Sequence, residues 1–191
     1  MRYRTEILRT FDLTLVEFPL PRSIKMSEVI DSSINNLRSK IKAIRFAMLT
    51  TLNDDQTLSS RPMTQQQLDD NGTLWFFISD ESHLARDITS HPKINVTFAE
   101  PADSIYVSIS GNAEVLKHLE KAKELWSPAV AAWFPEGVDD PHLSLIKFTI
   151  HSAEYWDSHS NKMLQLFAIA KAAISGHPPT DIGEHEKLQF N

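Results

Sequence analysis

Two neighbouring segments decide the fold: INVTFA at residues 94–99 and SIYVSIS at residues 104–110. In both, apolar residues stand at every second position, as they do in a strand whose successive side chains point to opposite faces of a sheet. The apolar sets are Ile94, Val96 and Phe98 in the first segment and Ile105, Val107 and Ile109 in the second. The opposite face of the second segment carries Tyr106, Ser108 and Ser110. That face is polar but uncharged, which suits a ligand or an interface.

The chain before these strands predicts a helix and then more strands. From Ser27, a suitable N-cap, apolar residues recur at gaps of four and three up to Ile44, which is the spacing of an amphipathic helix. Three segments bounded by polar turns follow, at 46–52, 57–67 and 74–78. They are interpreted as a three-stranded antiparallel meander.

The remaining chain adds helices around a long strand. Ser82 caps a short helix that ends at His91-Pro92, and residues 118–134 favour a helix broken by Pro128. A strand over 143–156 and a last helix over 161–174 complete the pattern. Six strands with peripheral helices indicate an α+β domain, or a barrel decorated with helices, in preference to a parallel α/β fold.

Composition limits the classes of function. The 191 residues carry a formal net charge of −6 and no cysteine. The negative charge argues against nucleic acid and anionic membrane as partners. The absence of cysteine excludes thiolate chemistry and suits the reducing cytoplasm. No apolar run approaches the roughly 20 residues that cross a bilayer. Residues 1–26 are interpreted as an N-terminal extension, not a signal peptide, with Met26 as an alternative initiator, and residues 27–191 as one domain.

Several common catalytic motifs are missing. The five glycines are too far apart for a dinucleotide-binding motif or a phosphate-binding loop, and no G-x-S-x-G elbow is present. The histidines have no spacing typical of metal ligation, so neither a metal site nor a hydrolase triad is predicted.

Two segments suit an anion. Arg61 stands among hydroxyl residues in SSRPMT at 59–64, and its guanidinium matches a phosphate, although a surface arginine at a strand edge is the simpler interpretation of this segment alone. The segment from Ser79 to His83 leads into a helix start, where free backbone N–H groups favour a phosphate. Asp80 and Glu81 would repel a phosphate unless they point away, and a plain acidic capping turn is the alternative.

Taken together, the motifs resemble the general stress protein 26 branch of the pyridoxamine 5′-phosphate oxidase-like FMN-binding split barrels. The likeness runs from about residue 28 to residue 185. It rests on SRPM at 60–63, GTLWFF at 72–77 with Ser79 and Ser82-His83, YVSISG at 106–111, LWSP at 125–128, WFPEG at 133–137 with Asp140-Pro141, and AEYWD at 153–157.

The resemblance implies a six-stranded antiparallel split β-barrel that forms a homodimer, with FMN at the subunit interface. By position, Arg61 and the Ser82-His83 turn would hold the phosphate. Met63 and Thr64 would lie along the ribityl chain, and the backbone of Phe77 and Ile78 would line the ring. Ser79 is also expected among the cofactor-binding residues. Tyr106 would reach the flavin, and Trp156 would close the ring site, from its own or the partner subunit.

Position 84, where many relatives carry a lysine for the phosphate, is Leu84. A charged hydrogen bond is worth about 1.5–3 kcal/mol, so its loss is expected to weaken FMN binding by one to two orders of magnitude unless another residue compensates.

The implied function is an FMN-dependent oxidoreductase of unspecified substrate. Oxidation of vitamin B6 is disfavoured, because relatives that perform it carry C-terminal arginines and this chain has none after Arg86. A non-catalytic flavin-binding or flavin-sensing stress protein is the alternative. A third hypothesis keeps the barrel but exchanges FMN for a deazaflavin or for haem, with His83, His151 and His159 as the candidate haem ligands; surface histidines are their preferred interpretation.

Overall fold

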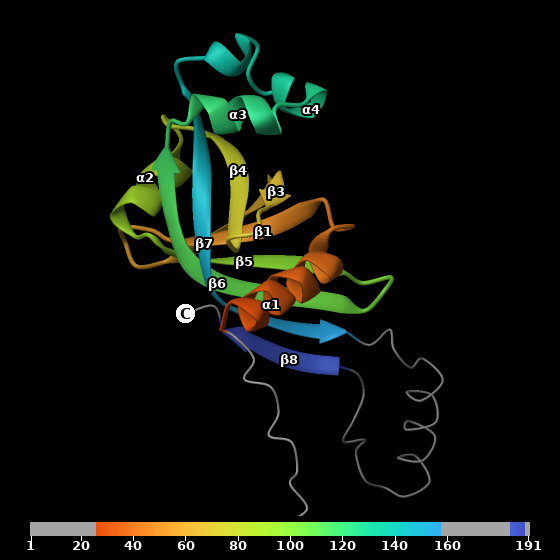
Figure 1. The fold of residues 1–191 in the computed structure, drawn as a ribbon. Coiled ribbons are helices and arrows are strands. Elements are labelled where there is room, and N and C mark those ends of the chain that lie inside the picture. The colour runs from red at the N-terminus through yellow and green to blue at the C-terminus, as the bar shows by residue number, and fades with distance from the viewer. Residues whose placement is uncertain (1–25, 158–183, 190–191) are drawn as a thin grey trace, which may run out of the picture.

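The computed structural model describes residues 26–157 and 184–189 (Figure 1). The helix predicted over 161–174 and most of the N-terminal extension lie outside these residues. The elements in chain order are α1 (Met26–Ile41), β1 (Phe46–Leu52), β2 (Leu58–Thr64), β3 (Gln67–Leu68), β4 (Thr73–Ser79), α2 (His83–Ser90), β5 (Lys93–Glu100), β6 (Ile105–Leu116), α3 (Leu119–Leu125), α4 (Pro128–Ala131), the 3-10 helix η1 (Gly137–Asp139), β7 (Leu143–Asp157) and β8 (Glu184–Gln189).

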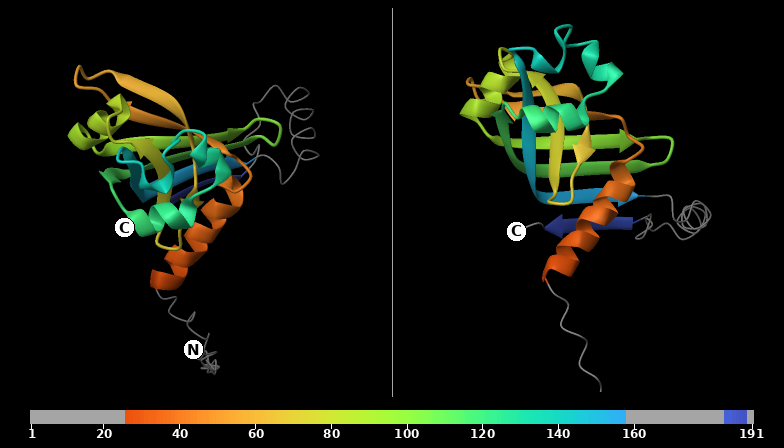
Figure 2. Two further views of the ribbon diagram at one scale, coloured as in Figure 1. Left: turned by 90° about the horizontal axis from the view of Figure 1, so that it is seen from above. Right: turned by 45° about the horizontal axis from the view of Figure 1, so that its top comes forward.

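The strands form one antiparallel sheet in the order β2-β1-β5-β6-β7-β4-β3, with β8 paired to β7. β2 and β3 stand at opposite ends of this order, yet only Gln65 and Gln66 separate them in the chain. The sheet must therefore curl until its two edges approach, and the ribbon views show this curl (Figure 2). The result is the predicted split barrel. Its described part has eight strands instead of six, because the segment 57–67 divides into β2 and β3 and because β8 was not predicted.

The predicted three-stranded meander is confirmed for the β1–β2 pair and wrong for the third strand, β4, apart from its short pairing with β3. β4 pairs with β3 and β7, not with β2. The physical reason is that β4 is buried on both faces: Leu74, Phe76 and Ile78 enter the main core, while Trp75 and Phe77 enter a second core. A strand with two buried faces belongs inside the sheet with a layer on each side.

The main core lies on the inner face of the sheet. We define the inner face by the buried alternate residues of the strands, such as Leu49, Val96 and Ile109, and the outer face by the residues between them. Helices α1 and α2 pack their apolar residues into this core. α1 begins at Met26, so Ser27 lies in its first turn and is not its N-cap. The partly buried ion pair Lys40–Asp157, at 2.7 Å, joins α1 to the end of β7.

The second core holds α3 and α4 against the far side of β4 and β7 at one end of the sheet (Figure 1). Phe77 packs edge-on against Trp126 with 5.9 Å between ring centroids, and Phe134 lies beside it at 6.4 Å. Pro128 ends the first helical segment as predicted and becomes the first residue of α4, where its missing N–H is not needed.

Gly111 marks a shift in register between β6 and β7. A Cβ atom at this position would lie 2.1 Å from the carbonyl oxygen of Thr149 and 3.0 Å from the ring of Phe148. Only glycine permits the two strands to come this close.

Candidate functional site

Arg61 lies on the inner face of the edge strand β2, opposite Leu49 of β1. Its Nη2 donates to Oδ2 of Asp87 in α2 at 3.1 Å. No carboxylate lies close to Arg61 along the chain, and the fold supplies one from 26 residues away. The other terminal nitrogen, Nη1, is buried and has no hydrogen-bond partner among the described residues. Arg61 is therefore oriented by Asp87 and retains one buried donor.

The start of α2 has the predicted capping geometry. The Ser82 hydroxyl accepts a hydrogen bond from the backbone N–H of Ala85 at 3.1 Å. His83 is exposed, and its Nδ1 lies 2.7 Å from Nη2 of Arg86. Leu84 is buried in the main core together with Ala85 and Ile88. The side chain at position 84 thus belongs to the packing of the barrel.

The two acidic residues before α2 are engaged with the chain on either side of α3 and α4. Asp80 forms an ion pair with Lys117 at 3.0 Å and contacts His142 at 3.3 Å, and Glu81 lies 3.4 Å from the same histidine. The hydrogen bond from Lys117, followed by that from His142, lowers the pKa of Asp80 below its ordinary value of 3.8. These contacts account for both carboxylates without directing them at Arg61.

β2 and β4 approach each other without forming a ladder, and we call this place the seam. Met63 is partly buried against the main core beside it, and Thr64 is half-buried. The side chains of Phe77 and Ile78 are used by the two cores, so these residues offer a ligand only their main chain. Beyond the two-residue β3, the only ladder described for β4 is the one with β7. The Ser79 hydroxyl accepts from the N–H of Glu81 at 3.3 Å and helps to shape the turn into α2.

Tyr106 and Trp156 lie elsewhere. They face each other across β6 and β7 on the outer face, with exposed fractions of 46% and 41%. Arg61 is on the inner face of β2, and three strand spacings, about 14 Å, separate it from β6. One chain therefore places Arg61, Met63 and Thr64 on β2 and Phe77, Ile78 and Ser79 on β4, the two strands of the seam. Ser82 and His83 stand at the start of α2, the helix that Asp87 joins to Arg61, whereas Tyr106 and Trp156 lie apart from these residues.

Two residues of this region were missed by sequence reasoning. Asp87 has no local signal, because its pairing with Arg61 depends on how α2 docks. Gln65 continues the alternation of Arg61 and Met63 by two residues, and its side chain has a buried oxygen, Oε1, without a hydrogen-bond partner among the described residues. That alternation could have identified Gln65.

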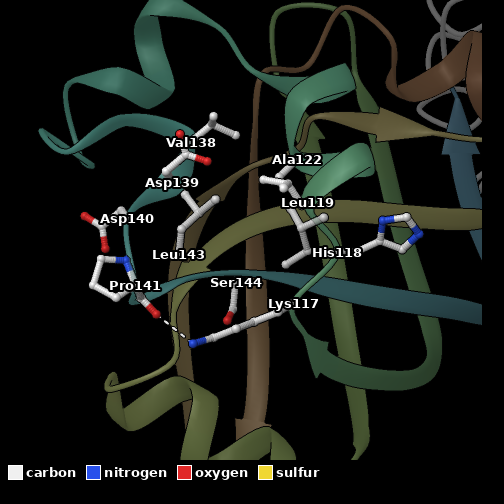
Figure 3. Close-up of a pocket in the computed structure, with 11 residues that line it drawn as sticks. Lys117, His118, Leu119, Ala122, Val138, Asp139, Asp140, Pro141, Leu143 and Ser144 are labelled. Atoms are coloured by element: carbon white, nitrogen blue, oxygen red, sulfur yellow. Dashed lines mark hydrogen bonds between the residues drawn. The ribbon is translucent and has the colours of Figure 1, made fainter.

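Two cavities among the described residues are lined without Arg61. One of about 280 Å³ lies between α3 and the segment leading into β7, with Lys117 reaching across it to the carbonyl oxygen of Pro141 (Figure 3). Another, of about 500 Å³, is lined by outer-face residues near Gly111, including Lys93, Asn95 and the exposed His151. His159 lies outside the described residues.

Within the described ranges no helix could span a membrane, and no group of three or more His, Asp or Glu residues could hold a metal ion.

The comparisons with known proteins decide the family. The model of the family described as pyridoxamine 5′-phosphate oxidase like matches residues 32–180. The chain belongs to this pyridoxamine 5′-phosphate oxidase-like family. The family membership and the curled antiparallel sheet agree with the resemblance inferred from the sequence motifs.

Individual relatives are distant in sequence, and the solved structures among them are similar in fold. The protein bli-3 of Neurospora crassa is 28% identical over 162 residues, which cover 79% of this chain and 77% of bli-3. The crystal structure of a candidate general stress protein 26 from Jannaschia sp. CCS1 matches 83% of this chain and 99% of its own at 28% identity, with a TM-score of 0.65. The general stress FMN/FAD binding protein of Xanthomonas citri matches 68% and 89% at 29% identity, with a TM-score of 0.54.

Proposed function

We propose that this protein binds FMN as a homodimer, with the cofactor phosphate on Arg61 and the flavin along the seam. The observation that carries the proposal is the buried Nη1 of Arg61, which has no hydrogen-bond partner among the described residues. An unsatisfied buried donor costs about 1–3 kcal/mol, more when the group is charged, so the fold gains stability when an anion meets it. A phosphate has the charge and the acceptor oxygens for this guanidinium.

The surroundings support a flavin as the rest of the ligand. Met63 offers an apolar side chain next to Arg61 on the same face, and the β4 edge offers main-chain groups. The Ser82 turn starts α2, whose first N–H groups favour a negative charge. The similarity to a general stress FMN/FAD binding protein agrees with this choice. Bound FMN supplies the capacity to accept and donate electrons.

A second subunit explains the position of Tyr106 and Trp156. The outer face of β1, β5 and β6 carries Phe46 and Met48, which are 59% and 42% exposed, beside uncharged polar residues such as Thr97 and Ser108. Apolar and uncharged surface is typical of the centre of a protein interface. In a homodimer built on this face, Tyr106 and Trp156 of one subunit would lie toward the seam of the other.

The proposal extends to an oxidoreductase of the stress-protein type, in which the flavin exchanges electrons with a small substrate. The alternative is a protein that only binds or senses flavin. One observation favours that alternative: Met63 and Gln65, which follow Arg61 on the same face of the chain, are neither acids nor bases. The nearby ionisable side chains already have partners, because Asp87 pairs with Arg61 and His83 contacts Arg86.

Two measurements test these statements. Purified protein incubated with FMN and then desalted should keep a yellow flavin spectrum with a stoichiometry of one FMN per chain; protein that stays colourless contradicts FMN binding. Steady-state oxidation of NADH or NADPH by the FMN-loaded protein should exceed the rate of free FMN. A rate no higher than that of free FMN favours the non-catalytic alternative.

A further inference from the structure

Three buried side-chain atoms have no hydrogen-bond partner among the described residues: Thr51 Oγ1, Arg61 Nη1 and Gln65 Oε1. Two of them, Arg61 Nη1 and Gln65 Oε1, come from the same stretch of chain and flank Met63. One is a donor and the other is an acceptor. A buried acceptor without a partner destabilises the fold, and native folds contain few such atoms, so Gln65 requires an explanation.

The orientation of the Gln65 amide is fixed by its other end. Its Nε2 donates to the carbonyl oxygen of Ile41, the last residue of α1, at 3.3 Å. A carbonyl oxygen can only accept, so the amide nitrogen must face α1 and the amide oxygen must face the other way. The next residue holds the backbone in place, because the N–H of Gln66 donates to the carbonyl oxygen of Trp75 in β4 at 2.9 Å. Gln65 therefore presents an acceptor from a fixed position.

An acceptor selects a ligand group with an N–H or O–H. Gln65 follows Arg61 by four residues, which corresponds to about 13 Å of extended chain. FMN carries its phosphate at one end and, at the other end of the oxidised ring, a single ring N–H at the imide nitrogen N3. We infer that Gln65 Oε1 accepts a hydrogen bond from the flavin N3–H while Arg61 Nη1 donates to the phosphate. This inference rests on the proposed FMN binding.

The ribityl hydroxyls are the other donors of FMN, but they lie next to the phosphate and so nearer to Met63 than to Gln65. The N3–H is the donor at the required end of the molecule. Gln65 thereby becomes a specificity residue for the pyrimidine side of the flavin ring. If N3 is methylated, Gln65 Oε1 loses the N3–H as its hydrogen-bond donor and faces a methyl group instead.

The test compares the dissociation constants of FMN and 3-methyl-FMN for the full chain and two variants. Q65M replaces the amide by an apolar side chain of similar length. Q66M is the matched control, because the Gln66 side chain bonds only to the carbonyl oxygen of Thr64 among the described residues. Far-UV circular dichroism and thermal unfolding check that each variant folds.

Wild-type protein should bind FMN at least about 10-fold more tightly than 3-methyl-FMN, the factor that corresponds to 1.4 kcal/mol. Q65M should reduce this ratio to less than about 3-fold, and Q66M should retain it. A wild-type ratio near one overturns the inference even if Q65M fails to fold. A Q65M ratio equal to that of wild type also overturns the inference. If Q65M weakens the binding of FMN and of 3-methyl-FMN equally, Gln65 contacts a ribityl hydroxyl instead, and the inference is again wrong.

The outcomes separate this inference from the proposed function. If wild-type protein binds neither flavin, both fail together. If FMN binds and depends on Arg61, but the preference over 3-methyl-FMN does not depend on Gln65, only the role of Gln65 fails.

Discussion

Arg61 and Asp87 form an ion pair of 3.1 Å that joins the edge strand β2 to helix α2. The side chains of Arg61 and Asp87 retain 31% and 16% of their exposure, so the contact is partly screened from water. Asp87 uses one terminal nitrogen of the guanidinium and leaves the other, which is buried, for a ligand. The pair thus holds the arginine in place, but it also sets a negative charge beside the proposed phosphate.

The first prediction follows from that charge. D87N keeps an oxygen that accepts from Arg61 and removes the charge that opposes the phosphate. FMN affinity should rise several-fold at low salt, and the gain should shrink as added salt screens the site. Riboflavin affinity, measured by the same fluorescence titration, should not change. A fall in FMN affinity would show that the carboxylate charge itself is needed to hold Arg61.

The outer face provides a prediction about assembly. Met48 is 42% exposed among uncharged residues of that face, and in the proposed dimer it is buried. M48K would place an unpaired ammonium group in the interface and should raise the dimer dissociation constant at least about 10-fold. Sedimentation velocity measures this shift. Leu119 of α3 has a similar exposed fraction, 46%, away from this face, so L119K serves as the control. Equal dimer dissociation constants for M48K and L119K would exclude this face as the interface.

Gly111 should tolerate no side chain. In G111A the new methyl group meets the Thr149 carbonyl at 2.1 Å, and relieving this overlap should lower the free energy of unfolding by about 3 kcal/mol or more. Gly137 provides the contrast, because it has a φ of +84° but no atom within 4 Å of an added Cβ. G137A should cost only about 1–2 kcal/mol from backbone strain. Urea denaturation compares the two, and a smaller loss in G111A than in G137A would be inconsistent with the close approach of β6 and β7.

The lowered pKa of Asp80 gives a dependence of stability on pH. Because the pKa is lower in the folded state, the stabilisation is fully present above the unfolded value near 3.8 and is lost as the pH falls through the folded value. K117M removes the first cause of the shift. Between about pH 5 and pH 2, K117M should lose less stability than wild type does. The difference should be small, because water screens this partly exposed ion pair. K42M, at an exposed position after α1, should follow the wild-type curve. Parallel curves for K117M and wild type would argue against this ion pair.

Local signals predicted the parts of the fold that depend on neighbouring residues. The Ser82 cap, the end of α2 at His91-Pro92, the break at Pro128 and the uncharged face of Tyr106 and Ser108 all follow from spacing within a few residues, and the structure has each of them. Capping and strand alternation are short-range effects, so a single sequence contains them.

The errors concern contacts between distant parts of the chain. The segment 57–67 contains no glycine that would mark the break at Gln65-Gln66, so local signals predict one strand where the structure has two. The partner of β4 is β7, about seventy residues later, and the partner of Arg61 comes from α2. The proposed division of the flavin site between two subunits is likewise invisible in local spacing.

The most direct test of the account is the loss of FMN affinity in R61A relative to riboflavin, which has the same ring and ribityl chain but no phosphate. Calorimetric or fluorescence titration should show that R61A binds FMN about 10- to 100-fold more weakly than wild type, as expected for the loss of a charge-assisted hydrogen bond, with riboflavin affinity nearly unchanged. K123A, at an exposed lysine of α3, should bind both ligands as wild type does. Equal losses of FMN and riboflavin in R61A, or no loss of either, would contradict the assignment of Arg61 to the phosphate.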